Sequence, residues 1–152
     1  MLVMLAAACL AACAAEPDSP ETQIHALLRS AEAAAEDKDA AALKQLISEA
    51  YSDERGQDRQ ALVGLLTFYF LRNESIHLLT RVQSIAFPEP ARADATVFVA
   101  MAGTPIIAAE ELARIRADLY RFDFSLSDEG GGDSDWKVSR AAWRRATADD
   151  FF

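Results

Sequence analysis

Apolar residues recur at helical spacing through the first half of the chain. Three stretches place apolar residues three or four positions apart, and they cover residues 20–37, 40–47 and 59–72. This periodicity is typical of amphipathic helices that bury one face. Ser19, Asp39 and Asp58 each precede one of these stretches, and all three residue types cap helix N-termini well. The pattern therefore predicts three consecutive helices.

Beyond Ser75 the pattern changes to β-branched and aromatic residues in roughly alternating order. The alternation is clearest between Tyr120 and Leu126, which indicates a strand with one dry and one wet face. The other predicted elements are strands over 76–87, 94–102 and 136–146, turns at 88–90 and 130–132, and a short helix over 108–115. Helices followed by strands indicate an α+β domain in which a sheet buries its dry face against helices.

The length and charge of the chain limit its function. The chain has 152 residues, of which 51% are hydrophobic and 26% charged, and its formal net charge is -9. These values indicate one globular domain. The acidic charge argues against nucleic-acid binding, because counterion release requires a basic face. It also gives no attraction to an anionic bilayer.

Both cysteines lie near the start of the chain, at Cys9 and Cys13. The sequence after them therefore offers no disulfide, no cysteine nucleophile and no thiolate metal site. Histidine ligands are also scarce, because only His25 and His77 occur. We therefore predict no metal site and no cofactor.

Residues 1–12 are apolar, carry no charged side chain and form too short a stretch to span a membrane. They predict a signal peptide. The segment from Leu10 to Cys13, Leu-Ala-Ala-Cys, resembles the lipobox of bacterial lipoprotein precursors, in which the chain is cut before the cysteine. The resemblance implies that Cys13 is the lipidated first residue of the mature chain. A plain secretory signal that leaves Cys13 unmodified is the alternative.

The lipobox resemblance also sets the expected domain boundaries and localisation. Residues 13–19 would form a lipidated tether and residues 20–152 the folded domain. Multiple acylation would hold this domain stably at a membrane surface. Ala14 occupies the position at which Asp often marks retention in the inner membrane. We therefore expect a lipid-anchored protein of the bacterial cell envelope, in the outer membrane and facing the periplasm.

The order of the predicted elements also carries a resemblance. It rests on the first helix, with Ile24, Leu27 and Leu28, on the alternating strand 120–126, and on Trp136, Lys137, Val138, Ala141 and Trp143. This arrangement resembles the NTF2-like superfamily, which includes nuclear transport factor 2, ketosteroid isomerase and the polyketide-cyclase type of cone. The resemblance covers about residues 21–146. It implies an NTF2-like cone, with three N-terminal helices packed on a curved antiparallel sheet.

Such a cone can leave a mostly apolar pocket with a few polar groups converging on it. The candidates for lining this pocket are Tyr69, His77, Asp118, Tyr120 and Trp143. Plainer roles remain open, because Asp118 has arginine neighbours, His77 suits a strand edge or core, and Tyr120 suits an aromatic core. No catalytic triad and no motif for ketosteroid isomerase chemistry is present. We therefore predict no catalytic residue.

These observations lead to one expected function and two alternatives. We expect a membrane-anchored lipoprotein that binds a small, apolar ligand or an envelope partner without catalysis. The first alternative is an isomerase- or cyclase-type enzyme that uses the cone pocket. The second is a homodimeric structural module, since domains of this superfamily often pair through the exposed face of the sheet.

Overall fold

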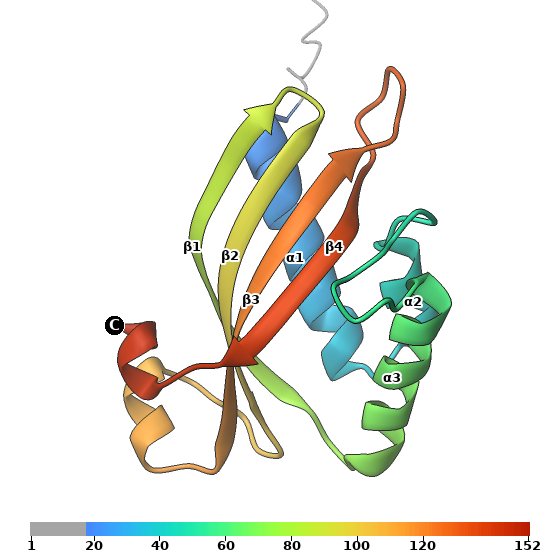
Figure 1. The fold of residues 1–152 in the computed structure, drawn as a ribbon. Helices are drawn as coiled ribbons and strands as arrows, with labels where there is room; N and C mark the ends of the chain where they lie inside the picture. Colours follow the sequence, from blue (N-terminus) through green and yellow to red (C-terminus); the bar gives the residue numbers. More distant parts are fainter. Residues whose placement is uncertain (1–17) are drawn as a thin grey trace, which may run out of the picture.

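The computed structural model describes residues 18–152 and shows three helices followed by a four-stranded antiparallel sheet (Figure 1). The helices are α1 (Pro20–Glu36), α2 (Ala40–Gln45) and α3 (Arg59–Arg72). The strands are β1 (His77–Glu89), β2 (Arg92–Ala102), β3 (Ala117–Asp128) and β4 (Trp136–Arg145). Two short 3₁₀ helices complete the described chain, η1 (Ala109–Ala113) and η2 (Ala148–Phe151). The predicted signal peptide and Cys13 lie outside the described residues.

The predicted helix starts are confirmed. Ser19, Asp39 and Asp58 each accept a hydrogen bond from a backbone N–H inside the first turn of the following helix. These bonds satisfy donors that would otherwise have no partner within the helix. No helix within residues 18–152 combines the length and the apolar character needed to cross a membrane.

The sheet has the order β1-β2-β3-β4, and its inner face packs on α1, which crosses behind the strands in Figure 1. Side chains alternate between the two faces along each strand. Phe124 and Leu126 of β3 lie on the inner face and pack in one cluster with Ile24 and Leu27 of α1. Thr80 of β1 lies on the same face, and its hydroxyl donates to the carboxylate of Glu32 in α1 at 2.7 Å. The predicted alternation in β3 therefore buries its apolar side against the helices, as expected.

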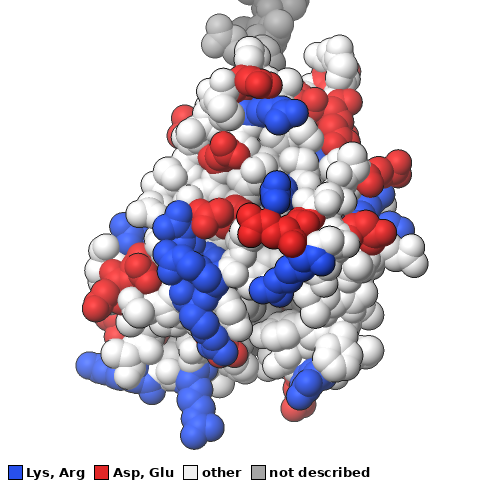
Figure 2. Space-filling view, viewed as in Figure 1, with Lys and Arg blue, Asp and Glu red and all other residues white. Residues whose placement is uncertain are grey.

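The exposed part of the sheet's outer face is polar, and it faces the viewer in Figure 2, where positive and negative side chains mix across its middle. Arg121 forms an ion pair with Asp123 at 2.8 Å, and the hydroxyl of Thr96 donates to the same carboxylate. Arg81 donates to the backbone carbonyls of Asp150 and Phe152, so the end of the chain is held on this face. Arg121, Asp123 and Arg81 are therefore engaged within the domain.

The predicted turn at 88–90 is partly wrong. Pro88 lies inside β1, and the chain turns at Pro90 and Ala91. Proline has no N–H for a sheet ladder, but β1 is an edge strand, and its pairing with β2 shifts between Ala86 and Glu89. The sequence does not reveal that this strand is an edge.

The predicted short helix over 108–115 forms as the 3₁₀ helix η1. The acidic tail also folds, because η2 begins with a capping box between Thr147 and Asp150. Phe151 of η2 packs with Leu112 of η1 and with Phe98 on the outer face of the sheet, so the two short helices cover one end of that face. The C-terminal residues are thus part of the domain core.

Candidate functional site

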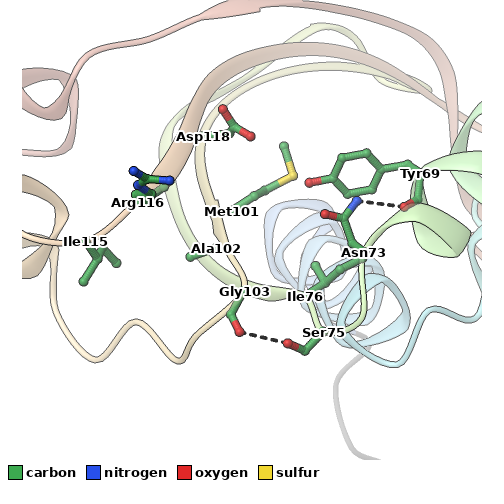
Figure 3. Close-up of a pocket in the computed structure, with 11 residues that line it drawn as sticks. Tyr69, Asn73, Ser75, Ile76, Met101, Ala102, Gly103, Ile115, Arg116 and Asp118 are labelled. Atoms are coloured by element: carbon green, nitrogen blue, oxygen red, sulfur yellow. Dashed lines mark hydrogen bonds between the residues drawn. The ribbon is translucent and has the colours of Figure 1, made fainter.

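A cavity of about 440 Å³ lies where α3 ends and where β2 leads into β3. Its walls come from the last turn of α3, residues 73–76, the end of β2 and the start of β3 (Figure 3). Ile76, Met101 and Ile115 give it an apolar side. Two chain regions that are separated in sequence therefore form one concave site.

The polar groups of the cavity begin with Tyr69, in the last turn of α3. Its hydroxyl group points across the cavity towards Met101 and Asp118 (Figure 3). Partial burial raises the pKa of Tyr69, and the nearby Asp118 and Tyr120 raise it further. The hydroxyl group is therefore neutral near pH 7 and can donate a hydrogen bond to a ligand.

Asn73 and Ser75 form the polar rim beside Tyr69. The side-chain N–H of Asn73 donates to the backbone carbonyl of Tyr69 at 2.8 Å, which satisfies an acceptor at the C-terminal end of α3. The hydroxyl of Ser75 donates to the carbonyl of Gly103 at 2.8 Å. These two bonds fix the loop after α3 against the end of β2, and so hold the cavity wall in place (Figure 3).

The opposite side of the cavity carries Arg116 and Asp118. Asp118 accepts a hydrogen bond from Arg145 at 2.6 Å, and both side chains of this pair are more than half exposed. The guanidinium group of Arg145 also lies over the ring of Tyr120, 5.0 Å from its centroid. The carboxylate is thus engaged by a neighbour, whereas Arg116 has no ion pair among residues 18–152.

The five predicted pocket residues have different positions. Tyr69 and Asp118 line the cavity, whereas Tyr120 does not and lies under the Arg145 guanidinium that bonds to Asp118. His77 pairs with Ala102 in the ladder between β1 and β2 and is not among the lining residues. Trp143 lies farther along the sheet. Whether any of them binds a ligand stays a prediction.

Trp143 borders a second, smaller cavity of about 100 Å³. The guanidinium group of Arg55 lies 4.6 Å from the Trp143 ring centroid, and Phe122 packs on the ring from a neighbouring strand. Asp53 is buried beside this position. Burial alone would raise the pKa of Asp53, but hydrogen bonds from the backbone N–H groups of Gln57 and Arg55 outweigh it and lower the pKa.

Sequence reasoning missed nine of the eleven lining residues, among them Asn73, Ser75, Met101 and Arg116. Each lies at or next to the end of a helix or strand, so the alternation within an element does not identify it. The available signal was position: a polar residue directly after a helix, or directly before a strand, is placed at an end of the sheet where cavities form.

The fold is similar to those of several known structures. Residues of this chain superpose on a candidate scytalone dehydratase from Novosphingobium aromaticivorans with a TM-score of 0.65 and 14% identity, covering 84% of this chain and 85% of that one. An NTF2-like protein of unknown function in nutrient uptake from Rhodospirillum rubrum gives 0.62 and 14%, covering 82% and 98%. The described chain has the NTF2-like fold.

A ketosteroid isomerase-like protein from Erwinia carotovora shares the NTF2-like fold at a TM-score of 0.59 and 11% identity, covering 82% of this chain and 94% of that one. No protein-family model and no curated protein sequence matches the chain. At these identities the likeness establishes the fold alone, because one fold supports many functions. The predicted α+β cone with three N-terminal helices is confirmed.

The cavity of this domain differs from the mostly apolar pocket that we expected. Tyr69, Asn73, Ser75, Arg116 and Asp118 give it a mainly polar lining. The arrangement offers a neutral hydroxyl donor, a cationic group and an apolar wall around one space. Such a lining favours a small molecule that has both polar and apolar parts.

Proposed function

We propose that the NTF2-like domain binds a small amphipathic molecule in the cavity beside Tyr69. The observation that carries this proposal is the neutral hydroxyl group of Tyr69, which faces a space of about 440 Å³. That volume falls in the usual range for small-molecule sites. An acceptor atom of the ligand would accept a hydrogen bond from the Tyr69 hydroxyl. The ligand's anionic group would pair with Arg116, and its apolar part would lie on Ile76 and Met101.

The proposed function is binding without catalysis. General acid–base catalysis works best with a group whose pKa lies near the operating pH. The pKa of Tyr69 is raised, which makes its hydroxyl a weaker acid, and the carboxylate of Asp118 is engaged by Arg145. The eleven lining residues contain no histidine, cysteine or lysine. These features support a ligand carrier or sensor over an isomerase or cyclase.

We also propose that the domain is tethered to the cell envelope through lipidated Cys13 and faces the periplasm. The described chain begins beside the N-terminus of α1, whereas the cavity lies near the opposite end of that helix (Figure 1). With 17 residues, α1 is about 25 Å long. A tether at residues 13–19 would therefore leave the cavity open on the side away from the membrane.

Native mass spectrometry of the full chain, purified from its own envelope in a mild detergent, tests the binding proposal. A small molecule should co-purify with the wild-type chain and be lost from Ser75→Trp, because this exposed wall residue would place an indole ring in the cavity. Ser134→Trp, at an exposed site in the loop before β4, should keep the molecule. Equal retention by both variants would contradict binding in this cavity.

Membrane fractionation tests the tether separately. Cys13→Ser should move the protein from the membrane fraction to the soluble fraction, because no acyl chain can then be attached. Cys9→Ser, at the other cysteine of the leader, is the matched control and should leave the protein on the membrane. A Cys13→Ser protein that stays on membranes through detergent-free washing would refute the lipid anchor.

A further inference from the structure

Helix α3 is apolar on both sides, although only one side packs in the domain. Leu62 and Phe70 are buried against the core. On the other side Leu65, Phe68 and Leu71 are 41%, 56% and 81% exposed. The surface over α3, at the lower right of Figure 2, is accordingly almost free of charged side chains. A contiguous apolar patch on a helix marks an interaction surface more often than an isolated exposed side chain does.

The exposed side of α3 has a shape that complements itself. Its N-terminal half presents the small residues Ala61 and Gly64, and its C-terminal half presents the large residues Phe68 and Leu71. Nothing lies within 4 Å of a Cβ built on Gly64, so open space lies above this glycine. In an antiparallel pair of helices related by a twofold axis midway between Gly64 and Phe68, Phe68 lies opposite Gly64 and Leu71 lies opposite Ala61.

The charges at the two ends of α3 fit the same arrangement. Asp58 caps the N-terminus through its Oδ1 atom, which accepts from the backbone N–H of Ala61 at 2.8 Å. Arg72 lies in the last turn on the exposed side, with its guanidinium group 5.4 Å from the Phe68 ring centroid. An antiparallel pair places Arg72 beside Asp58 of the partner subunit twice, once at each end of the contact, because a twofold contact is reciprocal.

The other large surface does not offer a comparable contact. The exposed part of the sheet's outer face is charged, with Arg121 engaged by Asp123 and Arg81 by the C-terminal carbonyls. A membrane is also a poor occupant for the α3 patch. The C-terminal end of α3 lies at the opposite end of α1 from the start of the described chain (Figure 1). A membrane tether at the N-terminus, as proposed above, would therefore hold this patch away from the bilayer.

We propose that two copies of this chain associate through the exposed side of α3, in an antiparallel arrangement that seats Phe68 over Gly64 of the partner subunit. Ala61, Leu65 and Leu71 complete the apolar contact, and Arg72 closes each end. The contact is one helix wide, so it is smaller than a standard stable interface and forms a dimer that dissociates on dilution. This surface is distinct from the outer face of the sheet, through which we predicted pairing from the sequence.

Sedimentation of the full chain carrying Cys13→Ser, measured over a range of concentrations, tests this dimer. The Cys13→Ser chain should show a reversible monomer–dimer equilibrium. Phe68→Glu should weaken it more than tenfold, because a carboxylate would be buried against an apolar surface. Ile107→Glu is the control, since Ile107 is 84% exposed and lies away from α3; it should leave the equilibrium unchanged.

Gly64→Leu distinguishes the specific pairing from nonspecific apolar association. Leucine favours a helix over glycine, and the space above Gly64 accommodates it, so the monomer should be at least as stable as the unsubstituted one. The added side chain fills the space into which Phe68 of the other subunit would pack, so dimer affinity should fall at least tenfold. A Gly64→Leu dimer as tight as or tighter than the unsubstituted dimer would overturn the proposed arrangement, because nonspecific apolar association increases with added apolar area.

Two further outcomes would also overturn the proposal. One is a chain that stays monomeric up to the highest concentration reached. The other is flotation of the Cys13→Ser chain with phosphatidylcholine vesicles that depends on Phe68 while no dimer forms, which would assign the α3 patch to a lipid surface.

Discussion

The two ends of the sheet's inner face differ in what covers them, and strand β3 runs through both. At one end, Leu126 is 1% exposed and packs with Ile24 and Trp136. At the other end, eight residues earlier on the same face, Asp118 borders the cavity with a side chain that is 54% exposed. We call the first the filled end and the second the cavity end. One alternating strand therefore supplies both a packed core and an open site.

The difference arises from the helices above the sheet. Ile24 and Leu27 of α1 lie directly on the filled end, and the indole N–H of Trp136 donates to Gln23 of the same helix at 3.0 Å. At the cavity end only the last turn of α3 and the loop of residues 73–76 remain above the sheet. Stability should therefore depend on the filled end, and ligand binding on the cavity end.

The largest expected effect is on folding, from truncating the filled end. Leu126→Ala should lower the free energy of unfolding by about 2–5 kcal/mol, because it opens a cavity among fully buried neighbours. Asp118→Ala should cost about 1 kcal/mol or less, because its ion pair with Arg145 is exposed to solvent. Urea denaturation of both variants measures the difference, and equal losses would contradict the division of the sheet into two ends.

High pH should destabilise the filled end through Tyr51. Burial and the neighbouring Asp53 raise the pKa of Tyr51 from 10.0 to about 12. The folded chain therefore favours the neutral hydroxyl, so this stabilisation is complete below pH 10 and is lost as the pH rises towards about 12. The loss should be about 2–3 kcal/mol.

Thermal unfolding at several pH values between 9 and 12 checks the Tyr51 prediction. Tyr51→Phe should remove most of the decline, because phenylalanine cannot ionise. Tyr69→Phe should remove less of it, because Tyr69 lies at the more open cavity end. A decline that persists unchanged in Tyr51→Phe would mean that another group controls alkaline unfolding.

The contrast between the two ends also explains what the sequence predicts well. The helix caps and the alternation of Tyr120 to Leu126 are local signals, and the structure confirms both. Most of the filled end follows from them, because Ile24, Leu27, Phe124 and Leu126 all belong to predicted apolar stripes. Pro88 was placed wrongly, since its fit within β1 depends on that strand being an edge.

The cavity end was predicted less well, because it is built where separate elements meet. Tyr69 and Asp118 were identified as candidates and do line one cavity. His77 lies one position after the lining residue Ile76, and in a strand one position reverses the face that a side chain occupies. Trp143 lies on the inner face, as Asp118 does, but it pairs with Phe122, which lies farther along the sheet from the cavity end. Register of this kind is set by strand pairing, which the sequence alone does not give.

The smallest predicted effect isolates one hydroxyl group at the cavity end. Tyr69→Phe should weaken binding of the co-purifying ligand by about 3- to 10-fold, because it removes one neutral hydrogen bond that contributes about 1 kcal/mol. Unfolding free energy should change little, since no other described residue depends on that hydroxyl. Titration calorimetry on ligand-stripped protein gives the affinity.

Tyr51→Phe is the matched control for this experiment, because it removes a hydroxyl from the filled end instead. Its hydroxyl donates to Asp53 at 3.3 Å inside the core, so the variant should lose some stability and keep the wild-type affinity. Tyr69→Phe should therefore weaken binding and leave stability almost unchanged, whereas Tyr51→Phe should lower stability and leave binding unchanged. If both variants altered binding equally, the cavity would not be the ligand site, and the two ends of the sheet would act as one unit.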